Sequence, residues 1–114
     1  MGLITGTLRV HQLQDALHDM EFRVQEITQS KLAISHDLCE VADQAAMAAI
    51  EGKDSEAIKS LEADKMRLEA FEKTLDARMS QYNSKIQAIQ TEMESAKKVV
   101  DYNIKSSFTY GGGQ

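Results

Sequence analysis

The chain contains no proline, no tryptophan, one cysteine and few aromatic residues. Without proline, nothing in the sequence forces a long helix to break, and the composition is typical of long helices. A single cysteine excludes an internal disulfide and any zinc motif built on cysteine pairs. No stretch approaches the roughly 18 apolar residues needed to span a bilayer. At 114 residues, the chain is predicted to form one all-α domain.

Charge and the start of the chain narrow the range of partners and locations. The formal net charge of −5 argues against sequence-independent nucleic-acid binding and against docking on an anionic membrane surface. Residues 1–54 contain 4 basic and 9 acidic residues, whereas residues 55–114 contain 9 of each. The first half therefore presents an acidic outer face, which is either solvated or a docking site for a basic partner. Because the N-terminus lacks a basic start and a long apolar run, we expect cytoplasmic synthesis and, for an exported chain, a route that reads no cleaved signal.

One apolar column dominates the first half of the chain. Its members recur at alternating steps of three and four residues, interrupted only by Lys31. A repeat of this kind keeps a narrow stripe facing a partner helix and is typical of a coiled coil. The column consists of Val10, Leu13, Leu17, Met20, Val24, Ile27, Lys31, Ile34, Leu38, Val41, Ala45 and Ala48.

One strong break interrupts the helical pattern near the middle of the chain. Gly52 can adopt the left-handed conformation that ends a helix, and Asp54 or Ser55 can cap the next one. A connection this short makes the two helices antiparallel neighbours. The sequence thus predicts an antiparallel two-helix hairpin, a coiled coil within a single domain covering residues 1–114. Its predicted parts are a short N-terminal segment (1–6), a helix over about 7–50, a turn at 51–55, a helix over about 55–105, and a flexible glycine-rich tail (106–114).

The second helix carries a column of its own, with either Phe71 or Glu72 facing the first helix. With Phe71 on the seam, the steps around it become three, four and four, which is a stutter that relaxes the supercoil locally. The other members are Leu68, Leu75, Met79, Tyr82, Ile86, Ile89, Met93, Ala96 and Val100.

Further apolar residues fall outside both columns, mostly near the turn. Because two helices cover only one face each, these residues predict packing against additional helices, from other copies of the chain or from a partner. The alternative is that they are broad knobs of an ordinary seam. At the C-terminus, three apolar residues are predicted to have no cover within the chain. The predicted interaction residues are Leu32, Cys39, Ala46, Ile50, Ala63, Met66, Ala70, Ile104, Phe108 and Tyr110.

Few residues suggest chemistry. Lys31 within the column either fixes register or oligomeric state, or extends its charged end to solvent. His11, Asp15 and His18 share a helix face and have the spacing of metal ligands, but the interpretation as solvent-facing polar residues is favoured. No nucleophile is paired with a base, and no glycine-rich loop precedes a helix. We therefore predict no enzyme activity, no metal site and no cofactor.

The chain combines Gln- and Ser-rich amphipathic helices, a short polar turn and a C-terminal helix that ends near an aromatic residue. In this outline, over Thr7–Phe108, it resembles the helical-hairpin substrates and coiled-coil accessory proteins of flagellar and type III export systems. It departs from prefoldin subunits, which insert β-hairpins where this chain has a five-residue turn. It also lacks the Trp-x-Gly turn of short secreted hairpins and the proline-containing turn usual in type III needle subunits.

Together, these features predict a non-enzymatic structural protein that self-assembles through helix–helix contacts, as a subunit of a filament or bundle. The resemblance implies that such a subunit is exported without a cleaved signal. The alternative is a cytoplasmic coiled-coil chaperone or adaptor that binds a partner helix. The expected partners are other copies of the chain or another helical protein, with neither nucleic acid nor a membrane span involved.

Overall fold

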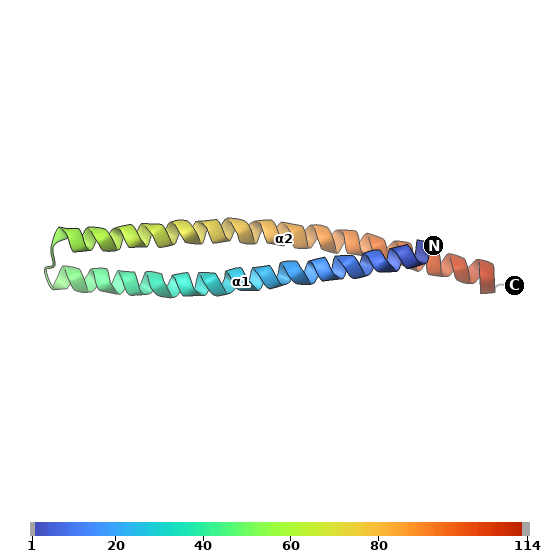
Figure 1. Cartoon of the computed structure of the whole chain (residues 1–114), viewed down its shortest axis with the longest axis horizontal. Helices are drawn as coiled ribbons and strands as arrows, with labels where there is room; N and C mark the ends of the chain where they lie inside the picture. The colour runs from blue at the N-terminus through green and yellow to red at the C-terminus, as the bar shows by residue number, and fades with distance from the viewer. Residues whose placement is uncertain (1, 113–114) are drawn as a thin grey trace. The chain divides into compact units, whose positions relative to one another are not determined.

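The computed structural model describes residues 2–112, with side chains described for residues 3–106. In this range the chain forms two helices, α1 (Gly2–Ile50) and α2 (Ser55–Gly112), and no strand. Figure 1 shows α1 in blue to green and α2 in green to red, joined by the turn. The predicted all-α antiparallel hairpin is confirmed.

The turn is built by backbone hydrogen bonds around one glycine. The amide of Lys53 donates to the carbonyl of Ala48 at 3.0 Å, and the amide of Gly52 donates to the carbonyl of Ala49 at 3.3 Å. Together with a φ of +69° at Gly52, these two bonds form a Schellman motif, which satisfies the last carbonyls of α1. Asp54 then caps α2, because its carboxylate accepts a hydrogen bond from the amide of Ala57 at 3.0 Å.

The apolar column of α1 faces α2 as predicted. All twelve of its members are buried or half-buried, whereas most of the residues between them are exposed. The buried hydrophobic residues of the described range are Leu13, Ile27, Ile34, Ala48 and Leu75. A core this small follows from the architecture, since each of two paired helices can bury only one stripe.

Contacts divide the chain into two compact units. The terminal unit consists of Met1–Arg23 and Tyr82–Gln114, and the turn unit consists of Val24–Gln81. Each unit pairs a segment of α1 with an antiparallel segment of α2. In the terminal unit, Arg9 forms an ion pair with Glu92, while in the turn unit Lys31 forms one with Asp76.

The helices extend beyond the predicted ends. α1 begins at Gly2 instead of about residue 7, because Gly6 continues the three-four column and packs against α2 at a close approach to Val100. This packing offsets the roughly 1 kcal/mol by which glycine disfavours a helix. α2 continues to Gly112 instead of ending near residue 105. No proline stops it, and propagating an existing helix adds a hydrogen bond for each residue fixed.

The structure also decides which residue of α2 occupies the disputed seam position. Glu72 is half-buried, and Phe71 is exposed. The heptad pattern of α2 therefore runs unbroken back to Leu68. The stutter consists of two consecutive steps of four residues, from Asp64 to Leu68 and from Leu68 to Glu72, and lies closer to the turn than predicted.

In the part of the chain that the structure describes, neither helix is long and apolar enough to cross a membrane.

Candidate functional site

The predicted interaction residues near the turn all lie in the turn unit and are all exposed. On α1, Leu32 is 68% and Ile50 is 82% exposed. On α2, Met66 is 71% exposed, and Phe71 adds an aromatic side chain that is 53% exposed. We call these sets the α1 strip (Leu32, Cys39, Ala46 and Ile50) and the α2 strip (Ala63, Met66, Ala70 and Phe71). Both strips present apolar surface away from the hairpin seam.

The predicted C-terminal contact residues belong to the terminal unit. Ile104 is 49% exposed. The side chains of Phe108 and Tyr110 lie outside the described residues. Because Gly6 of α1 approaches Val100 of the antiparallel α2, the first described residue of α1 pairs near residue 104 of α2. The last turns of α2 therefore extend past the start of α1.

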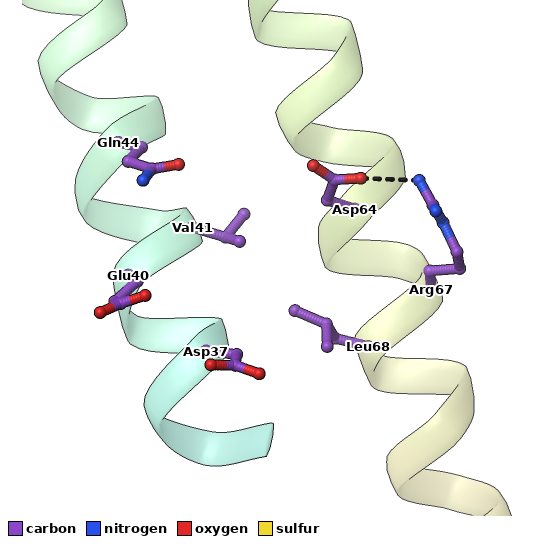
Figure 2. A pocket seen from close by; sticks show the side chains of 7 residues that line it. All are labelled: Asp37, Glu40, Val41, Gln44, Asp64, Arg67 and Leu68. Atoms are coloured by element: carbon purple, nitrogen blue, oxygen red, sulfur yellow. Dashed lines mark hydrogen bonds and ion pairs between the residues drawn. The ribbon is translucent and has the colours of Figure 1, made fainter. Parts of the chain in front are cut away.

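A groove that the sequence did not predict runs along one side of the turn unit. Two adjoining cavities of about 310 and 650 Å³ share Gln44 in their linings and form this turn-unit groove. Figure 2 shows Val41 and Leu68 pointing toward each other from α1 and α2, with Glu40 beside them on α1. Closer to the turn, the apolar part of the lining comes from Met47, Ala48, Ala57 and Leu61.

Small side chains explain why the groove lies near the turn. Ala45 and Ala48 occupy two consecutive seam positions of α1, and Ala57 faces them from the first turn of α2. Alanine fills little of the space between helices, which leaves room for a groove there. The steps of four around Leu68 shift the seam of α2 sideways at the other end of the groove. The alanines are visible in the sequence and were the available signal for this feature.

The rim of the turn-unit groove is acidic. Asp37, Glu40 and Asp43 line it from α1. Arg67 of α2 is engaged by Asp64, whose carboxylate lies 2.6 Å from the guanidinium (Figure 2). The three acidic residues of α1 have no comparable partner among the described residues, apart from His36 at 3.8 Å from Glu40 and 3.9 Å from Asp37.

Lys31 reaches the edge of the seam, where it joins two acidic residues of α2. Its ammonium lies 2.5 Å from the carboxylate of Asp76, and its side chain is 34% exposed. The hydrogen bond to Asp76, together with the charges of Asp76 and Glu72, raises the pKa of Lys31 against a smaller effect of desolvation. Glu72, on the seam next to this pair, lies close enough for its carboxylate to act on the ammonium of Lys31.

Tyr82 forms a second polar contact at the seam, in the terminal unit. The guanidinium of Arg23 lies 6.0 Å and the ammonium of Lys85 lies 5.6 Å from the centre of its ring. The hydrogen bond to Asp19 raises the pKa of Arg23 further above its ordinary value, and the hydrogen bond to Tyr82 adds to this effect. Both cations lie over the ring of this half-buried side chain, in the arrangement of cation–π contacts.

Potential metal ligands gather at one place in the described part of the chain. His36, Asp37 and Glu40 hold their ligand atoms within 4.8 Å of one another, and all three are exposed. The trio suggested by the sequence, His11, Asp15 and His18, does not form such a group. Three exposed residues on one helix face leave most of the coordination sphere of a metal to water, so this group does not define a metal site.

The chain matches no protein-family model, no curated protein and no solved structure.

Proposed function

We propose that the protein is a structural subunit that self-assembles through helix–helix contacts of its turn unit. The observation that carries this proposal is the exposure of large apolar side chains, led by Leu32, Ile50 and Met66, in a hairpin with only five buried hydrophobic residues in its described range. Single exposed apolar residues are ordinary, but strips of them on two faces of one unit are typical of contact surfaces.

The energetics favour a contact that depends on concentration. A contact between the α1 strips of two copies buries Leu32 and Ile50 of each copy and so removes four large apolar groups from water. At about 1.5–3 kcal/mol for each fully buried side chain, the gross gain is on the order of 10 kcal/mol. Association costs about 4–15 kcal/mol in lost translational and rotational freedom. One contact is therefore weak, and stable assembly needs each copy to make contacts on both strips, as in a bundle or filament.

Export without a cleaved signal is part of the proposal, supported by the resemblance of this hairpin plan to the helical-hairpin substrates and coiled-coil accessory proteins of flagellar and type III export systems. The adaptor alternative predicts a different oligomeric state. The strips of an adaptor would bind a partner helix, and the protein alone would form only a small oligomer.

The test introduces charge into the strips. Ala46→Glu and Ala63→Glu place a carboxylate on an exposed position of each strip, where the hairpin itself tolerates it. Ala88→Glu is the matched control, since Ala88 is also exposed and helical but lies in the terminal unit. We expect unchanged circular dichroism for all three variants, and loss of assembly in size-exclusion chromatography with light scattering for the first two only.

Assembly that survives both strip variants would contradict the proposal. Loss of helix content together with assembly would instead place Ala46 and Ala63 in the core of the hairpin. Equal loss of assembly in the Ala88→Glu control would show a general effect of charge and would also contradict the proposed role of the strips.

A further inference from the structure

A second uncharged column runs along α1 in the turn unit, beside the column that faces α2. Like the first, it alternates steps of three and four residues, the spacing that keeps a stripe facing a partner helix. All of its members are exposed, and its largest side chain, Leu32, is 68% exposed. We call it the outer column. It includes most of the α1 strip and consists of Thr28, Leu32, Ser35, Cys39, Ala42, Ala46 and Ala49.

The outer column carries no charge, although it lies on an acidic segment of α1. By their heptad positions, Asp37 and Glu40 face away from it, and Lys31 belongs to the seam. On the side away from α2, the column is bordered by His36 and Asp43. Like charges that face each other repel. Two copies of a chain with a net charge of −5 therefore meet more favourably through the outer column than through the acidic faces of α1.

The charges of α2 beside the outer column are balanced. Three acidic residues recur every seven positions on that side of α2, and each has a basic neighbour within reach. The pairs are Lys31 with Asp76 at 2.5 Å, Lys65 with Glu69 at 4.0 Å, and Lys59 with Glu62 three residues away. No block of one sign therefore opposes the approach of a second copy on this side.

The sizes of the side chains in the outer column match when two columns pack antiparallel. With a two-fold axis between residues 40 and 41, each bulkier side chain lies opposite an alanine of the second copy, which gives layers of similar width. Leu32 also comes beside Ile50 of the second copy, a side chain that is 82% exposed in the hairpin. A parallel pairing would instead place leucine against leucine and alanine against alanine. The antiparallel layers are Leu32 with Ala49, Ser35 with Ala46, and Cys39 with Ala42.

The residues that border the outer column favour the same register. In this register His36 of one copy comes near Asp43 of the other, where the imidazole can donate a hydrogen bond to the carboxylate. Sliding one copy by a heptad brings two His36 side chains together in one direction and two Asp43 side chains together in the other. Within its own chain His36 already lies 3.9 Å from Asp37 and 3.8 Å from Glu40, so the separation of the two Asp43 carboxylates is the stronger term.

We propose that the outer column of one copy packs antiparallel on the outer column of a second copy, about a two-fold axis between residues 40 and 41. This inference rests on the proposed function, because it specifies the contact that the α1 strips make. The contact is isologous, so it joins two hairpins and is then complete. Growth beyond the pair requires a second surface, and the α2 strip lies on the other helix, outside this contact.

Disulfide formation between introduced cysteines tests the register. Both chains carry Cys39→Ala; one adds Ser35→Cys, and the other adds Ala46→Cys and a tag that changes its mass. Two helices packed 8–10 Å apart bring opposed Cα atoms to about 4–6 Å, which suits a disulfide. In the proposed register, position 35 lies opposite position 46 of the second copy. Two copies of either position are eleven residues apart, about 16 Å along the helix, and cannot be bridged.

With oxidised glutathione as the oxidant, we expect the mixed chains to form a disulfide-linked heterodimer and neither chain alone to form a linked homodimer. Each protein disulfide reduces one molecule of oxidised glutathione to two thiols. The matched control replaces Ser35→Cys with Ala33→Cys, because Ala33 is exposed at nearly the same height of α1 and faces away from the outer column. Adding Ala42→Glu to both chains should abolish the linked heterodimer and leave the helical circular dichroism unchanged.

A linked homodimer from either chain alone would show a parallel pairing or a different register and would overturn the inference. A mixture that crosslinks no better than the Ala33→Cys control, while the native chain assembles in sedimentation velocity, would also overturn it. In that case the proposed function would stand and the contact would lie on another surface. Absence of both the crosslink and the assembly of the native chain would contradict the inference and the proposed function together.

Discussion

Gly6 offers the sharpest test of how the two helices meet in the terminal unit. Replacing a glycine inside a helix with alanine usually stabilises the helix by about 1 kcal/mol, because glycine has more backbone freedom to lose. At this position, however, a Cβ would lie 2.9 Å from Cγ2 of Val100. Carbon atoms in good contact are separated by about 3.5–4.0 Å, so the added methyl group overlaps the valine by roughly 0.6–1.1 Å.

The overlap cannot be relieved cheaply, since a β-branched side chain has one strongly preferred rotamer in a helix. Overpacking of this kind costs about 1–3 kcal/mol. It therefore cancels or exceeds the gain in helix propensity, and Gly6→Ala should leave the free energy of unfolding unchanged or lower it by up to about 2 kcal/mol. In a Val100→Ala background the clashing atom is gone, and the same substitution should stabilise the hairpin by about 1 kcal/mol.

The assay is urea denaturation followed by circular dichroism, at one protein concentration, for the native chain, both single variants and the double variant. The two substitutions should be coupled by about 1–3 kcal/mol in the favourable direction, as expected for residues in direct contact. If Gly6→Ala stabilises the chain by the same amount in both backgrounds, α1 does not approach α2 at this position.

Three further predictions concern the turn, the polar layer and the C-terminus. Gly52→Val should lower the free energy of unfolding by at least about 1–2 kcal/mol in urea denaturation, because Gly52 has a φ of +69°, whereas Gly52→Asn should cost much less. The pKa of Lys31 is raised, so its contribution to stability is fully present below the ordinary lysine pKa of 10.5 and is lost as the pH rises through the raised value. Thermal denaturation should show this alkaline loss in the native chain and not in Lys31→Met. Deleting residues 108–114 should weaken association in sedimentation equilibrium while barely changing helix content, and equal assembly of the truncated chain would count against a C-terminal contact.

The sequence predicted the parts of the fold that depend on one helix at a time. The period of the α1 column and the stop at Gly52 are local properties, and both are confirmed. At the disputed seam position, a charged residue, Glu72, lies near Lys31 of the other helix, and the apolar pattern of α2 alone could not predict this. The helical start of α1 likewise depends on the contact of Gly6 with α2, which glycine propensity does not reveal.

In the candidate site, too, the features of a single helix could be predicted from the sequence, whereas the relations between the two helices could not. The exposure of the α1 strip follows from heptad positions that point away from the seam, which the sequence gives directly. The turn-unit groove depends on how the small side chains Ala48 and Ala57 lie across from each other, and on the displaced seam at Leu68. These are relations between the two helices, and reading either helix separately does not predict them.

Sedimentation velocity of the full chain over a wide concentration range tests self-assembly most directly. The account predicts that the weight-average sedimentation coefficient rises continuously with concentration, because each copy adds contacts on more than one surface. A monomer or a fixed small oligomer at every concentration would contradict it.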